Sequence, residues 1–220
     1  MKHLTSTEFL AEAQIEEKYL PNLVYEDGFI WGDTSNGDKL RFLMTLVRNK
    51  FHDKSLLEIG TYRGTTTYNL VTNLSTGTVH TVDCGYEELK SLLAAEQPEH
   101  ANKIKYSAYE VGEVYKKHIG DTPAIKQITG NTTDDQIAAQ IINSGPYDLI
   151  YIDAAHTYEG IKSDTELVLQ CLGPGTVVIW DDYNGWWTGV NRYLDELDQT
   201  HALTYITDNR YVIYTHPGEK

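Results

Sequence analysis

The sequence lacks the features that would place it in a membrane or outside the cell. Its 220 residues contain no run of about 18 apolar residues, so no membrane-spanning helix is expected. The first residues, MKHLTSTEFLAEAQ, do not include the apolar segment of a secretory signal peptide. The sequence has only two cysteines, Cys84 and Cys171, which is typical of cytoplasmic proteins with reduced thiols. We therefore expect a cytoplasmic protein without a membrane partner.

Basic residues are also scarce. The 18 lysines and arginines stand against 32 aspartates and glutamates, which gives a net charge of −14. Nucleic-acid binding needs clustered Lys and Arg, and no such cluster occurs, so no nucleic-acid partner is expected. The absence of a Gly-x-Ser-x-Gly elbow and of a Cys-x-x-Cys pair argues against hydrolase, zinc and dithiol chemistry. The acidity favours neutral or cationic ligands or metal ions. A homo-oligomer is compatible with the sequence.

From residue 51 onward, short apolar segments alternate with helical patterns. Five of these segments predict strands, at residues 55–59, 78–83, 124–129, 147–153 and 176–180. Two more, at residues 203–206 and 211–214, predict an antiparallel hairpin. Strands that alternate with helices favour a parallel sheet covered on both faces. The pattern therefore predicts an α/β fold: a Rossmann-like, mostly parallel, seven-stranded sheet with helices on both faces and a C-terminal hairpin.

The first 50 residues show a different pattern. A capping signal at Ser6 and Glu8 predicts a helix over residues 5–20, which Pro21 ends. A glycine-rich loop follows, and residues 39–50 form an amphipathic helix in which Leu40 and Leu43 share the apolar face. Residues 1–50 are therefore expected to form an N-terminal helical cap on a Rossmann-like domain of residues 51–220, within one compact unit.

Acidic and small residues follow the predicted strands at one edge of the sheet. They are Glu58, Gly60, Asp83, Asn131, Asp153, Asp181 and Asp182. In open parallel sheets, ligands bind beyond the carboxyl ends of the strands, near the point where the strand order reverses. The repeated placement of acids at this edge predicts a functional site there.

The stretch LLEIGTYRGTTT couples the first strand to a helix through Gly60 and Gly64. The next strand ends at Asp83, which is 83 − 64 = 19 residues after Gly64. An acid at about 20 residues suits a pair of ribose hydroxyls. The spacing GxxxG differs from the dinucleotide fingerprint GxGxxG, which argues against a nucleotide-dependent oxidoreductase, although that class stays as an alternative. Glu58, just before the first glycine, would repel a pyrophosphate and suits a cationic ligand.

This combination resembles the class I S-adenosylmethionine-dependent methyltransferases, with Tyr62 at the place where a middle glycine is common. The resemblance implies that S-adenosylmethionine is the cofactor. It places the methionine part at the glycine loop, the ribose at Asp83 and the adenine at Asn131. The cofactor-binding residues that the resemblance implies are Glu58, Gly60, Thr61, Gly64, Asp83, Asn131 and Asp153. For Glu58, a structural role in capping the amides of the loop is the alternative.

A second stretch, YDLIYIDAAHTYEGIKSD followed by LGPGTVVIWDDY, resembles the small-molecule subfamily that includes sugar and macrolide O-methyltransferases. The resemblance covers about residues 53–183 and implies O-methylation of a small hydroxylated acceptor. It also implies a divalent cation, Mg²⁺ first, held by Asp153, Asp181 and Asp182, since oxygen ligands favour hard ions. Consecutive strand residues point to opposite faces, so Asp182 joins this site only if the strand ends there; otherwise it caps a turn.

His156 follows Asp153 by three residues, at the offset where catechol-type enzymes carry a lysine base. A histidine with a pKa of about 6.5 could remove a proton from the acceptor at neutral pH, with Asp153 as its catalytic partner. The alternative is that His156 only shapes the loop. Many relatives carry a second acid at the position of Ala155, so a non-catalytic cofactor- or metal-binding member of the fold is also considered. Trp186 and Trp187 could form a wall of the acceptor pocket.

Overall fold

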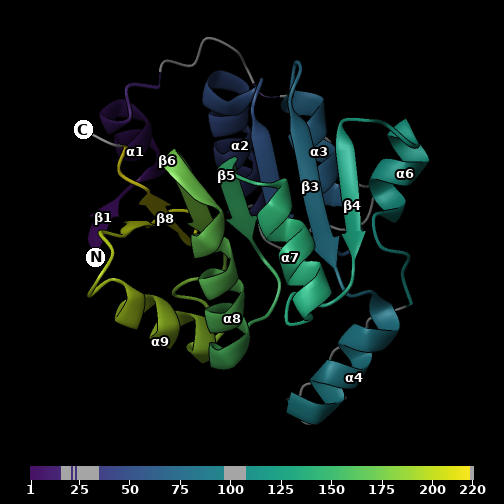
Figure 1. The fold of residues 1–220 in the computed structure, drawn as a ribbon. Helices are drawn as coiled ribbons and strands as arrows, with labels where there is room; N and C mark the ends of the chain where they lie inside the picture. Colours follow the sequence, from purple (N-terminus) through teal and green to yellow (C-terminus); the bar gives the residue numbers. More distant parts are fainter. Residues whose placement is uncertain (16–20, 22, 24–34, 97–107, 219–220) are drawn as a thin grey trace.

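A computed structural model of the chain describes residues 1–15, 21, 23, 35–96 and 108–218 (Figure 1). Its centre is one mixed sheet with the strand order β1-β7-β8-β6-β5-β2-β3-β4. The strands are β1 (Lys2–Leu4), β2 (Ser55–Ile59), β3 (Thr78–Asp83), β4 (Ile125–Thr129), β5 (Tyr147–Ile152), β6 (Leu172–Trp180), β7 (Thr204–Ile206) and β8 (Tyr211–Thr215). All neighbouring strands are parallel except for the pairs β6–β8 and β7–β8, where β8 runs in the opposite direction.

Helices cover both faces of this sheet. In Figure 1, α7 and α8 lie in front of the sheet and α2 and α3 lie behind it. The described helices are α1 (Ser6–Glu12), α2 (Ser35–Leu46), α3 (Thr65–Asn73), α4 (Tyr86–Glu96), α6 (Glu113–Ile119), α7 (Asp135–Ser144), α8 (Tyr158–Val168) and α9 (Thr188–Leu197). A π-helical turn, Val47–Phe51, continues α2, and a 3-10 turn, Leu169–Cys171, follows α8.

The sheet is buried on both faces because apolar residues predominate in its central strands. In β5, Ile150 and Ile152 belong to a core shared with the helices α7, α8 and α9. The alternate residues Leu149 and Tyr151 belong to a second core, which α2 and α3 complete. Period-two alternation between two buried faces is the arrangement expected of a parallel sheet. The register of each central strand is therefore determined from both sides.

The predicted α/β architecture and the C-terminal hairpin are confirmed, and the structure adds an eighth strand. Residues 2–4 pair in parallel with β7 at the edge of the sheet, although they fall within the predicted helical cap. This strand is too short and too polar to show a periodic pattern. The predicted helix over residues 5–20 begins at Ser6, with Thr5 as the cap in a capping box with Glu8, and α1 ends at Glu12. Residues 16–20 lie outside the described part of the chain.

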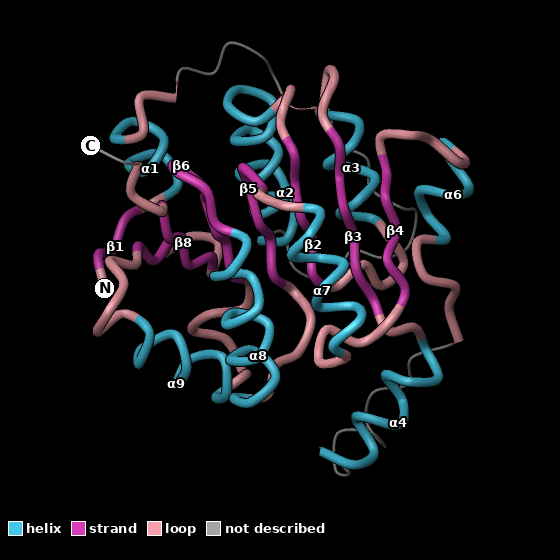
Figure 2. Tube along the Cα trace, viewed as in Figure 1, coloured by secondary structure: helices cyan, strands magenta, loops and turns pink. Residues whose placement is uncertain are grey.

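The strand order reverses between β2 and β5. β2 pairs with β3 on one side and with β5 on the other, and all three are parallel. Their carboxyl ends therefore meet at one edge of the sheet. The arrowheads of β3 and β5 point toward this edge in Figure 1, and Figure 2 shows the connecting loops there. At this edge Gly60 (φ +102°) lies so close to β5 that an added Cβ would be 2.0 Å from the carbonyl oxygen of Asp153.

Within the described residues, the structure contains no helix whose length and apolar character would allow it to span a membrane.

The close approach at Gly60 predicts an unusually severe effect for Gly60→Ala. A left-handed backbone alone costs an L-residue about 1–2 kcal/mol. Gly175→Ala is the matched control, because Gly175 also has a positive φ (+82°) but no atom within 4 Å of the added Cβ. Urea denaturation should show a larger loss of unfolding free energy for Gly60→Ala than for Gly175→Ala. Equal losses in the two variants would contradict the contact with Asp153.

Candidate active site

The predicted strand-end acids meet because β5 and β6 are paired in register. Ile152 lies opposite Trp180 in the parallel ladder, so the next residue of each strand, Asp153 and Asp181, emerges at the same edge. The backbone amide of Asp153 donates to the carbonyl of Ile59 over 2.9 Å, and that of Asp181 donates to Ile152 over 3.0 Å. The sheet ladder thus continues into the first residue of the site.

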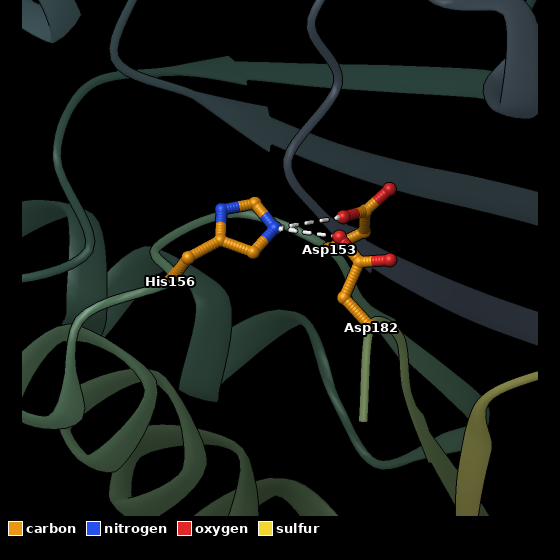
Figure 3. A group of neighbouring side chains, drawn as sticks. All are labelled: Asp153, His156 and Asp182. Atoms are coloured by element: carbon orange, nitrogen blue, oxygen red, sulfur yellow. Dashed lines mark ion pairs between the residues drawn. The ribbon is translucent and has the colours of Figure 1, made fainter. Parts of the chain in front are cut away.

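Asp182 joins the group because the strand ends before it. β6 stops at Trp180, and Asp182 has a left-handed backbone with φ +64°. The chain therefore turns, and the side chain of Asp182 points to the same place as that of Asp153 (Figure 3). Asp153, His156 and Asp182 each offer a ligand atom within 4.8 Å of the others. The strand therefore ends where the predicted site required it to end for Asp182 to lie beside Asp153.

His156 lies between two carboxylates. Its Nε2 is 3.6 Å from Oδ1 of Asp153 and 3.2 Å from Oδ2 of Asp182 (Figure 3). Its ring stacks on Trp187 at a centroid distance of 4.4 Å, and Nε1 of Trp187 donates to Oδ2 of Asp182 over 3.1 Å. Burial lowers the pKa of His156, but the two carboxylates outweigh burial and raise the pKa to about 9. The imidazole is therefore protonated at neutral pH, in contrast to the value near its ordinary pKa that the sequence suggested.

Sequence reasoning missed Lys39, which reaches the acids from α2. Its ammonium forms an ion pair with Asp181, and Nζ lies 3.5 Å from Oδ1 of Asp182 and 5.5 Å from the ring centroid of Tyr211. Burial lowers the pKa of Lys39, but the charges of Asp181 and Asp182 outweigh it and raise the pKa above its usual value. The signal was present in the sequence, because Lys39 precedes Leu43 by four residues and so lies on the apolar face of the predicted helix.

The pKa values of the two consecutive acids shift in opposite directions. Burial, followed by the charge of Asp153, raises the pKa of Asp181 to about 6 although Lys39 acts against it. Burial also raises the pKa of Asp182, but the hydrogen bond from His156 and the charges of Lys39 and Arg210 lower it well below the usual range. Nη2 of Arg210 lies 3.4 Å from Oδ1 of Asp182. The carboxylate with more cationic neighbours is thus the one with the lower pKa.

Protein donors already contact two of the three predicted magnesium ligands, Asp181 and Asp182. Asp181 accepts a hydrogen bond from the hydroxyl of Tyr151 over 2.8 Å on Oδ2 and contacts Lys39 through Oδ1. Both oxygens of Asp182 also face protein donors. Asp153 and Asp182 offer ligand atoms within 4.8 Å of each other and of His156, whose Nε2 lies 3.6 Å from Asp153 and 3.2 Å from Asp182. Protein cations thus face the oxygens that Mg²⁺ would need.

The glycine loop of residues 60–64 is held in left-handed conformations. Gly60, Tyr62 and Gly64 all have positive φ, of +102°, +49° and +84°. Tyr62 therefore adopts a backbone conformation that favours glycine, the residue that the resemblance implies at this position. An added Cβ at Gly64 would lie 2.8 Å from Cα of Gly112, so this position needs glycine for space as well as for φ.

Glu58 and Thr61 point inward from this loop. Glu58 has no exposed surface and accepts hydrogen bonds from the hydroxyls of Thr67 and Thr81, each over 2.5 Å, while its Oε1 has no partner among the described residues. Thr61 is also buried, and its hydroxyl lies 2.5 Å from that of Thr81. Burial raises the pKa of Glu58 to about 8, although the two hydrogen bonds lower it. Glu58 thus links the start of the loop to α3 and β3 through threonine hydroxyls, a structural role that differs from the expected capping of the loop amides.

Asp83 and Asn131 organise the neighbouring loops. The carboxylate of Asp83 accepts from the backbone amides of Tyr62 and Gly85, each over 2.7 Å. It therefore holds the glycine loop against the end of β3 and keeps a lone pair on each oxygen for a further donor. Oδ1 of Asn131 accepts from the amide of Thr133 over 3.0 Å, which forms a turn before α7. Both residues lie at the same edge as Asp153.

Comparison with known proteins identifies the family. The family model described as Methyltransferase domain matches residues 57–183, more than half of the chain, and the chain belongs to this family. No curated protein matches the sequence. The structure is similar to the O-methyltransferase from Bacillus cereus in complex with SAH, at 20% identity over 96% of this chain and 89% of that one, with a TM-score of 0.50. It is also similar to cofactor-bound Rv0187 from MTB, at 18% identity over 96% and 88% of the two chains, with a TM-score of 0.52. The predicted resemblance to methyltransferases is confirmed.

The raised pKa of Glu58 predicts a stability that depends on pH. Between the usual pKa of 4.5 and the folded value of about 8, the folded chain binds more protons at this site than the unfolded chain. Its contribution to the unfolding free energy therefore falls as the pH rises through this range, by up to about 1.4 kcal/mol per pH unit. Glu58→Gln is neutral at every pH. Urea denaturation should therefore show that the unfolding free energy of Glu58→Gln increases relative to that of the wild type from pH 5 to pH 8. Parallel stability curves would contradict a carboxyl that is protonated in the fold.

Proposed function

We propose that the protein is an S-adenosylmethionine-dependent O-methyltransferase that acts on a small hydroxylated molecule. The observation that carries the proposal is that the glycine loop and the acid group are built at one sheet edge and touch through Gly60 and the carbonyl of Asp153. Membership of the methyltransferase-domain family, and the SAH complex of the B. cereus enzyme, support the choice of cofactor. S-adenosylmethionine supplies, when bound, a methyl group activated by a sulfonium.

On the cofactor side, Asp83 would accept hydrogen bonds from the ribose hydroxyls with the lone pairs that Tyr62 and Gly85 leave free. Gly60 and Gly64 would border the methionine part, and Asn131 would lie near the adenine. Glu58 and Thr61, which are buried, would support the loop from below.

On the acceptor side, Asp153 and His156 present the more accessible groups of the cluster, with side chains that are 36% and 25% exposed. We assign proton removal from the acceptor hydroxyl to His156, with Asp153 holding its ring. Because the two carboxylates raise the pKa of His156 to about 9, only about 1% of the imidazole is free to accept a proton at pH 7. An acceptor hydroxyl of similar acidity, such as a phenol, suits such a base.

Assistance by a divalent cation stays a prediction, and the proposed reaction assigns it no step. Asp153, Asp181 and Asp182 were its predicted ligands, and protein donors face the oxygens of the last two. Within the cluster, Lys39 and Arg210 already offset the negative charge. Positioning of the acceptor against the cofactor then supplies most of the acceleration.

Two alternatives make different predictions. A non-catalytic member of the fold is favoured by Ala155, which stands where many relatives have a second acid. It would bind S-adenosylhomocysteine tightly and transfer no methyl group to any member of a broad panel of acceptors. A nucleotide-dependent oxidoreductase would bind NAD(P) instead.

Calorimetric titration with S-adenosylhomocysteine tests the proposed cofactor. The wild type should bind one equivalent, and Asp83→Asn should weaken binding by about tenfold to a hundredfold, since hydrogen bonds to a charged group are worth about 1.5–3 kcal/mol. Asp148→Asn is the control, because this acid accepts from the amide of Ser55 at the opposite end of the sheet. Absence of binding by the folded wild type would refute the proposed function.

The pH dependence of methyl transfer tests the role of His156. With a pKa of about 9, kcat/KM should rise about tenfold per pH unit up to that value, because only the unprotonated ring accepts a proton. His156→Gln should remove this slope and lower the rate about 10²–10⁴-fold. His201→Gln, on the surface beside Thr200, should leave both unchanged. A pH slope that persists in His156→Gln would assign the base to another group.

A further inference from the structure

A buried lysine lies among the acids at the position expected for a metal ion. Lys39 is 7% exposed, forms an ion pair with Asp181, and lies 3.5 Å from Oδ1 of Asp182. It comes from α2, more than a hundred residues before β6 in the chain. An ammonium this deep in a protein is stable only when it is paired, and both of its anionic partners are residues predicted to bind a cation.

The surroundings of the ammonium match its charge and its donors. Tyr211 from β8 places its ring 5.5 Å from Nζ, which is within the range of a cation–π interaction. Tyr151 from β5 donates its hydroxyl to the other oxygen of Asp181 and so leaves one oxygen for the lysine. Asp182 also pairs with Arg210 and His156. The three carboxylates of the cluster thus face three basic side chains within the described structure.

A divalent cation would compete for the same atoms. Mg²⁺ and Mn²⁺ take carboxylate oxygens as ligands, and here the oxygen of Asp181 that faces the cluster contacts the ammonium. An ion beside Nζ would also be repelled by the buried positive charge of Lys39. Lysine and metal ion are therefore alternatives at Asp181 and Asp182.

We propose that the Lys39 ammonium is the resident cation of this cluster and takes the place of a divalent ion at Asp181 and Asp182. The side chain keeps the acids compact and holds Asp182 beside His156 without an added metal. The further consequence, that methyl transfer is independent of divalent ions, rests on the proposed function. The occupancy of the cation position does not depend on it.

Binding of Mn²⁺ alone, followed by electron paramagnetic resonance, tests the occupancy. The wild type should show only the weak binding expected of an acidic surface. Lys39→Met keeps the length of the side chain and removes its charge. It should gain one Mn²⁺ site that is at least about tenfold tighter than any in the wild type, because the buried carboxylate of Asp181 then lacks its cation. Mn²⁺ should also raise the melting temperature of Lys39→Met and not that of the wild type, since a ligand that binds the folded state stabilises it.

Three variants show whether the gained site is the predicted one. Lys39→Arg keeps the positive charge and should gain no site. Lys39→Met combined with Asp181→Asn should lose the gained site. Lys116→Met is the matched control, since Lys116 pairs with Glu110 at the surface, 2.8 Å away, and its loss should add no tight site.

One equivalent of tightly bound Mn²⁺ in the wild type would overturn the proposal, and this measurement does not depend on the stability of any variant. For the reaction itself, a chelator should leave methyl transfer by the wild type unchanged. If S-adenosylhomocysteine does not bind, the proposed function fails while the Mn²⁺ result still decides the role of Lys39. Loss of activity on chelation, with cofactor binding intact, would overturn the metal independence alone.

Discussion

The parallel pairing of β5 with β6 is the constraint on which the site depends. Ile152 lies opposite Trp180, so Asp153 and Asp181 leave the sheet side by side. A shift of one residue would turn every side chain of a strand to the other face. Two cores prevent this shift, because Ile150 is buried against the helices of one face and Leu149 against those of the other. The packing of the whole sheet therefore positions the acids.

Bringing three carboxylates together is unfavourable, and the structure offsets it with cations from distant parts of the chain. Lys39 reaches Asp181 and Asp182 from α2, and Arg210 reaches Asp182 from the turn before β8. The result is a divided cluster, in which the pKa of Asp181 is raised to about 6 and that of Asp182 is strongly lowered. The pKa values of neighbouring acids at the same strand end thus shift in opposite directions, since their partners differ.

The glycine loop is also held by buried polar contacts and close backbone packing. Glu58 anchors its base through Thr67 and Thr81, and Asp83 joins its turn to the end of β3 through the amide of Tyr62. Gly60 rests against the backbone of Asp153, so the loop and the acid group share one contact. A change that moves one of them must therefore move the other, which is the physical link between cofactor side and acceptor side in the proposed enzyme.

The sequence by itself determined the strands, their order along the chain and the acids that follow them, because apolar periodicity and strand-end residues are local properties. It also indicated the family through the segments around Gly60 and Asp153. Only the tertiary structure decided that β1 joins the sheet, that Glu58 and Thr61 point inward, and that Asp182 turns toward His156. It alone paired Lys39 with Asp181 and made His156 a protonated group. These properties depend on which distant side chains come within a few ångströms in a medium of low dielectric constant, and no local pattern encodes that distance.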